Sequence, residues 1–140
     1  MNYLVDTCVI SELVSRKPNS SVVKWIDAVE QSCLYLSVIT VGEISRGIEQ
    51  SKDVARKEML NNWLKSELLV RFQDRIVPIE LGVSIAWGRL TGVLASKGKP
   101  MPALDSLIAA TSLHHGLILA TRNVGDFRYS GVEIVDPWNA

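Results

Sequence analysis

Hydrophobic residues along the chain follow two spacings that alternate from one end to the other. Short apolar runs predict five strands, over residues 3–5, 34–38, 75–79, 117–121 and 132–135. Between them, apolar residues recur every three or four positions and predict helices over residues 11–16, 20–29, 40–48, 53–69, 81–96 and 105–115. This alternation favours an α/β fold with three layers, α/β/α, around a mainly parallel central sheet, built as a single domain of residues 1–140.

Proline and glycine mark where several of these elements end. Pro78 removes a backbone donor and predicts that the third strand lies at a sheet edge or ends early. Residues 97–102 read as a loop by composition, and Gly116 is a natural terminator for the apolar helix before it.

Composition restricts the class of protein without naming it. The chain has 140 residues, 47% of them hydrophobic and 21% charged, which is typical of a globular domain. No apolar run is long enough to span a membrane, and the N-terminus lacks a secretory signal. Cys8 and Cys33 are isolated, so we expect reduced thiols and a cytoplasmic location. Fifteen basic residues balance fifteen acidic ones. This balance gives no direct support for nucleic-acid binding but does not exclude it, because bound metal ions add positive charge.

Two acids lie where the first and second strands pass into helices. Asp6 ends the first strand, where ligands of open α/β sheets bind, although it could equally cap the following helix. Glu43 could form a capping box with Thr40. Glu43 also lies to one side of the core face of its helix. Gly47 follows one turn later, and its missing side chain leaves space for a ligand beside the carboxylate.

Two further acids lie later in the chain. Asp105 opens a helix that otherwise reads as interior, where a carboxylate is costly unless something pairs with it. The alternative is an acid that stabilises the helix dipole. Asp126 follows the fourth strand and could simply be a turn residue.

Taken together, the four acids predict a metal site. The carboxyl ends of parallel strands share one edge, so Asp6, Glu43, Asp105 and Asp126 are expected to converge there. Carboxylates crowded together repel unless a cation neutralises them, and an all-oxygen set suits Mg²⁺ or Mn²⁺. One or two such ions activate water for phosphodiester hydrolysis.

Other metal and nucleotide motifs are absent. His114 and His115 are adjacent, and neighbouring residues on a helix point about 100° apart, so this pair does not predict a metal site. The chain has no H-E-x-x-H, no P-loop and no G-x-S-x-G.

Four segments resemble the motifs of one family, the PIN-domain nucleases, in the expected order. The segments are Leu4 to Glu12, Leu36 to Ile48, Asp105 to Thr111 and Thr121 to Phe127. They extend over nearly the whole chain, and the nearest subgroup is the VapC/FitB-type toxins of bacterial toxin–antitoxin pairs.

The resemblance implies a Mg²⁺- or Mn²⁺-dependent endoribonuclease that cuts RNA, with tRNA among the candidate targets. It implies that Asp6 and Asp105 are metal ligands, with Glu43 the third acid and Asp126 the fourth. Some relatives carry an acid where this chain has Asn123. It further implies a homodimer, inhibited by a cognate DNA-binding antitoxin in a toxin–antitoxin hetero-oligomer. Operator DNA would be bound only through the antitoxin, and no membrane would be involved.

Alternatives remain beside this interpretation. One is a catalytically weak PIN-fold module that only binds. Another is a Mg²⁺-dependent phosphoacceptor or phosphatase domain, which expects a second acid near Asp6 that this chain lacks. Finally, the helical segment 53–69, with Trp63, Leu64, Leu68 and Leu69, is predicted to form a dimer or antitoxin surface.

Overall fold

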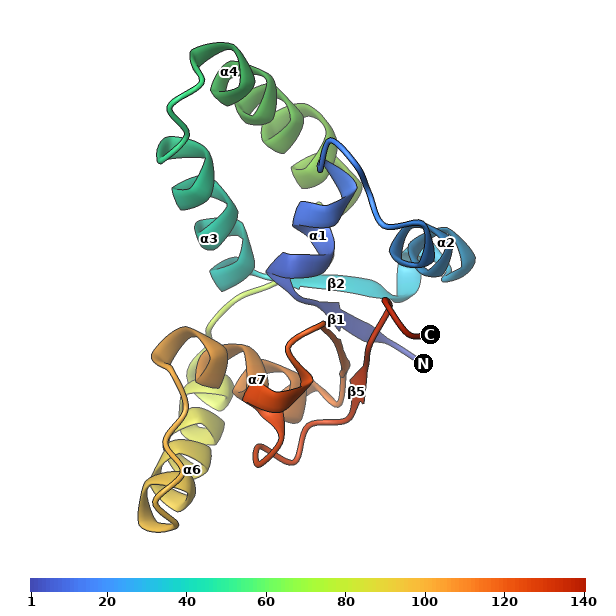
Figure 1. The fold of residues 1–140 in the computed structure, drawn as a ribbon. Helices are drawn as coiled ribbons and strands as arrows, with labels where there is room; N and C mark the ends of the chain where they lie inside the picture. The colour runs from blue at the N-terminus through green and yellow to red at the C-terminus, as the bar shows by residue number, and fades with distance from the viewer.

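A single five-stranded sheet runs through the computed structural model, which describes all residues 1–140 (Figure 1). The strand order is β3-β2-β1-β4-β5, and all four neighbouring pairs are parallel. The strands are β1 (Tyr3–Val5), β2 (Leu34–Ser37), β3 (Ile76–Val77), β4 (Ile118–Ala120) and β5 (Ile134–Val135). The predicted parallel sheet is therefore confirmed, and β3, with Pro78 directly after it, lies at an edge as expected.

Helices cover both faces of this sheet. Figure 1 shows α1 to α4 on one side of β1 and β2, and α6 and α7 on the other. The helices are α1 (Thr7–Leu13), α2 (Ser20–Ala28), α3 (Val38–Glu49), α4 (Val54–Trp63), α5 (Leu69–Arg71), α6 (Leu81–Ser96) and α7 (Ala103–His115). Three short turns complete the set: η1 (Gln31–Cys33), the π-helical η2 (Leu64–Leu68) and η3 (Val124–Phe127). The three-layer α/β/α architecture is confirmed.

Alternating residues of the central strand divide the interior into two cores. Val5 packs with residues of α1, α2 and α3 on one face, and Leu4 packs with Ile108 of α7 and Phe127 on the other. Successive strand side chains point to opposite faces, so one short strand serves both cores. The end of β1 is thereby held between two packed layers, which fixes the position of the next residue, Asp6.

Side-chain caps set the starts of the first three helices, and two of these starts, those of α1 and α3, differ from the sequence prediction. The first helix begins at Thr7 rather than residue 11, with Asp6 as its N-cap. Asn19 caps α2, because its side chain accepts from the backbone N–H groups of residues 21 and 22. Ser37 caps α3, so Thr40 lies inside that helix and the predicted capping box with Glu43 is wrong. In each case a side-chain oxygen one to three residues earlier satisfies the first free N–H groups.

The segment after residue 53 is helical as predicted, but several of its apolar side chains are not a free surface. Leu64 and Leu68 are buried in the larger core, and Trp63 and Leu69 pack against it. Leu64 and Leu68 are therefore not available as a binding surface, whereas Trp63 and Leu69 are only partly buried. The large apolar side chains that this segment does expose are Val54, at 78%, and Met59, at 49%.

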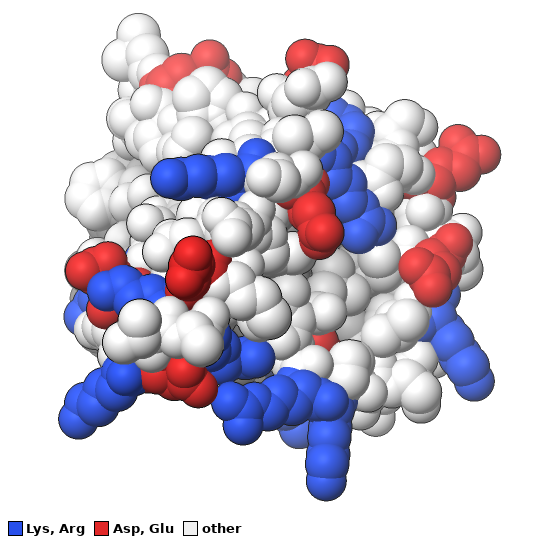
Figure 2. Space-filling model, turned by 90° about the horizontal axis from the view of Figure 1, so that it is seen from above, with Lys and Arg blue, Asp and Glu red and all other residues white.

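Charged side chains are interspersed over the surface. Figure 2 shows basic and acidic groups mixed on the face seen from above, with uncharged areas between them. This mixture agrees with the zero net charge of the sequence. No helix is both long enough and apolar enough to cross a membrane.

Candidate active site

Asp6 is a buried carboxylate held from two strands. One of its oxygens, Oδ1, accepts a hydrogen bond from the Thr7 backbone N–H at 2.8 Å. The other, Oδ2, accepts from the Thr121 hydroxyl at 2.7 Å, just beyond the end of β4. Asp6 is only 6% exposed. The helix-capping role and the site role considered from sequence are thus compatible, since both oxygens keep a free lone pair.

Glu43 reaches the same edge of the sheet from α3. Its Oε1 accepts a hydrogen bond from the Thr7 hydroxyl at 2.8 Å, which ties α3 to the first residue of α1. One turn later, no atom lies within 4 Å of where a Gly47 side chain would begin. Glu43 and Gly47 line one hollow together. The space that the sequence predicted beside this carboxylate is therefore present.

Asp105 lies in the first turn of α7, and the negative charges of the other three acids act on its carboxyl group. Its pKa is raised, first by partial burial of the carboxyl and then by the negative charges of Asp6, Asp126 and Glu43. A carboxylate responds in this way only to like charges that lie close to it. The tertiary fold thus places the other three predicted acids near enough to Asp105 to raise its pKa.

Asp126 comes from the short turn η3 and is exposed. Its backbone N–H donates to the Asn123 carbonyl at 3.1 Å, so the two residues share one turn. Asn123 is also exposed, and its N–H donates to the Thr121 hydroxyl at 3.1 Å. Thr121 therefore links this turn to Asp6, and the turn carries Asp126 to the open side of the site.

Cys8 belongs to the site's inner wall, which the sequence did not predict. Its Sγ lies 3.8 Å from Asp6 Oδ2 and 3.6 Å from the Thr121 hydroxyl, and it accepts from the Arg122 N–H at 3.5 Å. Burial is the main reason that the pKa of this thiol is raised. Its spacing two residues after Asp6 was the available signal. A neutral thiol adds no further negative charge beside Asp6.

A basic and aromatic rim adjoins the acids. Lys99, Asp126 and Tyr129 line one hollow. The Lys99 ammonium lies 3.7 Å from the centroid of the Tyr129 ring, and the Arg128 guanidinium lies 5.7 Å from it. Hydrogen bonding and charge from Lys99, and then from Arg128, lower the pKa of the Tyr129 phenol. Because Lys99 and Tyr129 are distant in sequence, their proximity was not predicted.

The donor set fits a hard divalent cation. All four side chains offer carboxylate oxygens, and none of them forms an ion pair with a lysine or arginine. Partly buried carboxylates that lack a basic partner are costly unless a cation neutralises them. Oxygen ligands of this kind suit Mg²⁺ and Mn²⁺ better than Zn²⁺.

Comparison with known proteins agrees with this fold. The family model for the PIN domain matches residues 3–129. VapC ribonuclease Y4jK of Sinorhizobium fredii is 36% identical over 96% of this chain and 96% of its own length. Toxin FitB of Neisseria gonorrhoeae is 35% identical over 97% of this chain and 98% of its own.

Solved structures agree as well. FitAcB from Neisseria gonorrhoeae superposes with a TM-score of 0.94 at 35% identity, covering 99% of both chains. FitAB bound to an IR36 DNA fragment superposes with a TM-score of 0.91 at 34% identity, covering 97% of this chain and 95% of the other.

The chain belongs to the PIN-domain family. The family match covers all four acids of the site, from Asp6 to Asp126. Within the family, its full-length relatives place it with the VapC and FitB toxins. Of the alternatives considered from sequence, this membership favours the nuclease over the phosphoacceptor and phosphatase domains.

Proposed function

We propose that this protein is the toxin of a toxin–antitoxin pair and acts as a Mg²⁺- or Mn²⁺-dependent endoribonuclease. The observation that carries the proposal is the convergence of four carboxylates, without a basic partner, at the carboxyl edge of the parallel sheet. The names of the full-length relatives, a VapC ribonuclease and a toxin, support it. A family resemblance gives the class of reaction, and the acids give the chemistry.

In this proposal Asp6, Glu43, Asp105 and Asp126 would hold the ion. A bound Mg²⁺ or Mn²⁺ supplies positive charge beside the phosphate and lowers the pKa of water. Thr7 orients Glu43 through its hydroxyl and Asp6 through its backbone N–H. Thr121 fixes the second oxygen of Asp6. These hydrogen bonds hold the carboxylates in place before substrate arrives, so little reorganisation is needed during the reaction.

The experiment that tests this function is cleavage of structured RNAs, including tRNAs, by purified antitoxin-free protein. We expect cuts in the presence of Mg²⁺ or Mn²⁺ and none in excess EDTA, with activity restored when the metal is added back. Cutting that persists in EDTA would contradict metal dependence. A folded protein that binds RNA but cuts none of the panel under any metal would support the weak binding module instead.

The rim beside Asp126 suits a single-stranded RNA. Tyr129 is 53% exposed, so a base can stack on its ring, and Lys99 and Arg128 lie close enough to contact a phosphate. Stacking on an aromatic ring beside basic groups is the usual way in which proteins hold unpaired nucleotides. We therefore assign this rim to the RNA strand near the cleaved bond.

Tyr129→Ala is expected to raise the KM for RNA about tenfold and to leave kcat within about twofold, because stacking contributes roughly 1–3 kcal/mol per base. Steady-state cleavage kinetics measure both quantities. Tyr129→Phe is the matched control, since it keeps the ring and should retain the wild-type KM. An equal rise in KM for both variants would show that the hydroxyl, not stacking, matters.

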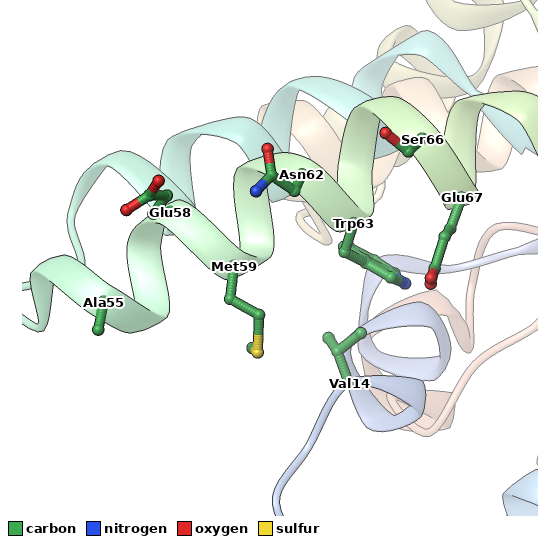
Figure 3. Close-up of a pocket in the computed structure, with 8 residues that line it drawn as sticks. All are labelled: Val14, Ala55, Glu58, Met59, Asn62, Trp63, Ser66 and Glu67. Atoms are coloured by element: carbon green, nitrogen blue, oxygen red, sulfur yellow. The ribbon is translucent and has the colours of Figure 1, made fainter.

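A groove beside α4 is suited to an antitoxin segment. It encloses about 750 Å³ between α4 and the end of α1. Figure 3 shows Met59 and Trp63 directed into the same space as Val14, with Glu67 beside them. Val14 and Trp63 also line the hollow that contains Glu43, so the groove continues toward the acids. A segment with apolar side chains and a basic end would match both the groove and the acidic site.

Met59→Arg is expected to weaken capture of the cognate antitoxin at least tenfold and to leave RNA cleavage unchanged. Met59 is half-exposed, so an arginine there is solvated and should change stability little. The antitoxin is co-purified with the toxin and then separated from it. Calorimetric titration of each toxin variant with this antitoxin measures the affinity. Val54→Arg, at a more exposed position of the same helix that lies outside the groove, is the matched control. Equal affinity of both variants would remove the groove from the proposal.

The remaining partner proposals follow from the exposed face of α6. This helix exposes three apolar side chains by at least 49%, those of Leu81, Ile85 and Val93. Monomeric proteins rarely leave so much neighbouring apolar surface open to water. We assign this face to a homodimer.

A structural relative, FitAB, was solved bound to DNA. By analogy, operator DNA would be reached through the antitoxin of a hetero-oligomer, with the complex acting in the cytoplasm.

A further inference from the structure

A second group of metal-binding side chains lies between α6 and α7. It consists of Glu80, the residue before α6, with His114 and His115, the last two residues of α7. Glu80 Oε1 is 3.4 Å from His115 Nε2 and 3.9 Å from His114 Nε2. One ligand atom from each of the three residues lies within 4.8 Å of the other two. Both histidines of the chain are therefore in this one cluster.

The sequence prediction that the histidine pair is not a metal motif considered α7 alone, and the structure adds a third side chain, Glu80, from the start of α6. α6 and α7 pack against each other, which places Glu80 beside the end of α7. The two imidazole rings lie edge to face with centroids 4.8 Å apart. Adjacent side chains of one helix point in different directions. Glu80, at the start of a second helix, nevertheless lies close to both imidazoles.

Gly82 positions one of the two rings. The His114 imidazole occupies the space next to this glycine, with Cε1 only 2.3 Å from where a Cβ atom would stand. Any larger residue would displace the ring, because real Cβ contacts are never that short. The backbone of α6 thus forms a close support for His114, while His115 faces Glu80 directly.

The ligand types identify the class of metal. Two imidazoles and one carboxylate are a frequent three-residue set for Zn²⁺, which leaves a fourth position for water. Ligand atoms around a tetrahedral zinc lie about 3.3 Å apart, given bonds of about 2.0–2.1 Å. The 3.4 Å separation matches this value, and the 3.9 Å one closes with a small rotation of exposed side chains. Mg²⁺ prefers oxygen ligands and would not compete here.

We propose that Glu80, His114 and His115 bind a Zn²⁺-class transition-metal ion at a site separate from the four acids. The cluster lies ten residues along α7 from Asp105, roughly 15 Å at the helical rise per residue. A bound ion would join the start of α6 to the end of α7. The proposal does not depend on the ribonuclease function, because it uses none of the four acids.

The test is a Zn²⁺ titration by calorimetry on tag-free protein in excess Mg²⁺, which occupies the acidic site. We expect one Zn²⁺ per chain with micromolar affinity. His115→Ala and Glu80→Gln should each weaken binding at least tenfold, and the two changes lie on different helices. Gly82→Ala should weaken it by displacing His114. Glu133→Gln, at an exposed carboxylate elsewhere, is the control and should bind as the wild type does.

Two results would overturn the proposal. One is a wild-type protein that binds no Zn²⁺ at a concentration of about 100 µM. The other is unchanged Zn²⁺ affinity in the His114→Ala/His115→Ala double variant, which removes every imidazole of the chain. Circular dichroism of each variant confirms that it is folded, as is expected for such surface changes.

Discussion

Asp105→Asn is expected to lower RNA cleavage by on the order of 100-fold or more while it makes the metal-free protein more stable at neutral pH. The loss of activity follows because a metal-site carboxylate contributes charge that a neutral amide does not supply. The gain in stability follows because Asp105 is partly buried and lies among three other acids. Cleavage kinetics and thermal unfolding without metal measure the two effects.

The raised pKa of Asp105 determines at which pH the Asp105→Asn variant is more stable than the wild type. The pKa of Asp105 in the folded protein is raised above its ordinary value. Its contribution to stability is therefore complete below the unfolded pKa, about 3.9, and is lost as pH rises through the folded pKa. Asparagine does not titrate. The variant and the wild type should thus unfold alike in acid and diverge as the pH approaches neutrality.

Metal reverses this order. If Mg²⁺ binds the four acids as proposed, it should raise the Tm of the folded wild type and leave that of Asp105→Asn nearly unchanged. Asp27→Asn, at an exposed position of α2, is the control and should match the wild type in every measurement. A less stable Asp105→Asn in the absence of metal would instead indicate that Asp105 mainly stabilises the helix dipole.

Leu68→Arg is expected to unfold the protein or to cost about 4 kcal/mol or more. Leu68 is only 2% exposed and belongs to the larger core, together with Leu64 and Phe72. A guanidinium there would lose its hydration without gaining a partner. Urea unfolding followed by circular dichroism measures the loss. Met59→Arg makes the same change nine residues earlier on a half-exposed side chain and should unfold near the wild-type midpoint.

This pair of variants separates two roles of one segment. If Leu68→Arg were as stable as Met59→Arg, the segment would be an accessory outside the core, as its amphipathic sequence first indicated. The expected difference instead means that α4, η2 and α5 cover the core with their inner side. Only their outer side can then bind a partner. Met59 then tests the groove, and Leu68 tests the fold.

Much of the fold follows from local sequence patterns. The limits of α6 were predicted to the residue, because apolar positions recur along it and a loop follows directly. Gly116 ends α7 with a φ of 65°, as a glycine after the last helical residue predicts. The proximity of Asp6 and Asp105 was also predictable, since the carboxyl ends of parallel strands and the first turns of the helices between them lie at a common edge.

Helix starts were harder to predict, because several polar residues near each start could serve as the cap. Thr40 had the right chemistry, but the side chain of Ser37 forms the capping hydrogen bond. Which of these oxygens meets a free N–H depends on where the preceding strand ends. That position is set by packing against other strands, not by the local sequence.

The sequence by itself determined the alternation of strands and helices, the parallel sheet and the four acids at its edge, because each depends on spacing or on residue type. Only the tertiary structure decided which side chains support those acids. The Thr121 hydroxyl bonds Asp6 across 115 residues, and Cys8 closes the inner wall beside them. It also decided that Leu68 is buried and that Glu80 meets the two histidines. Contacts between distant residues depend on how whole elements pack, and no local pattern encodes that.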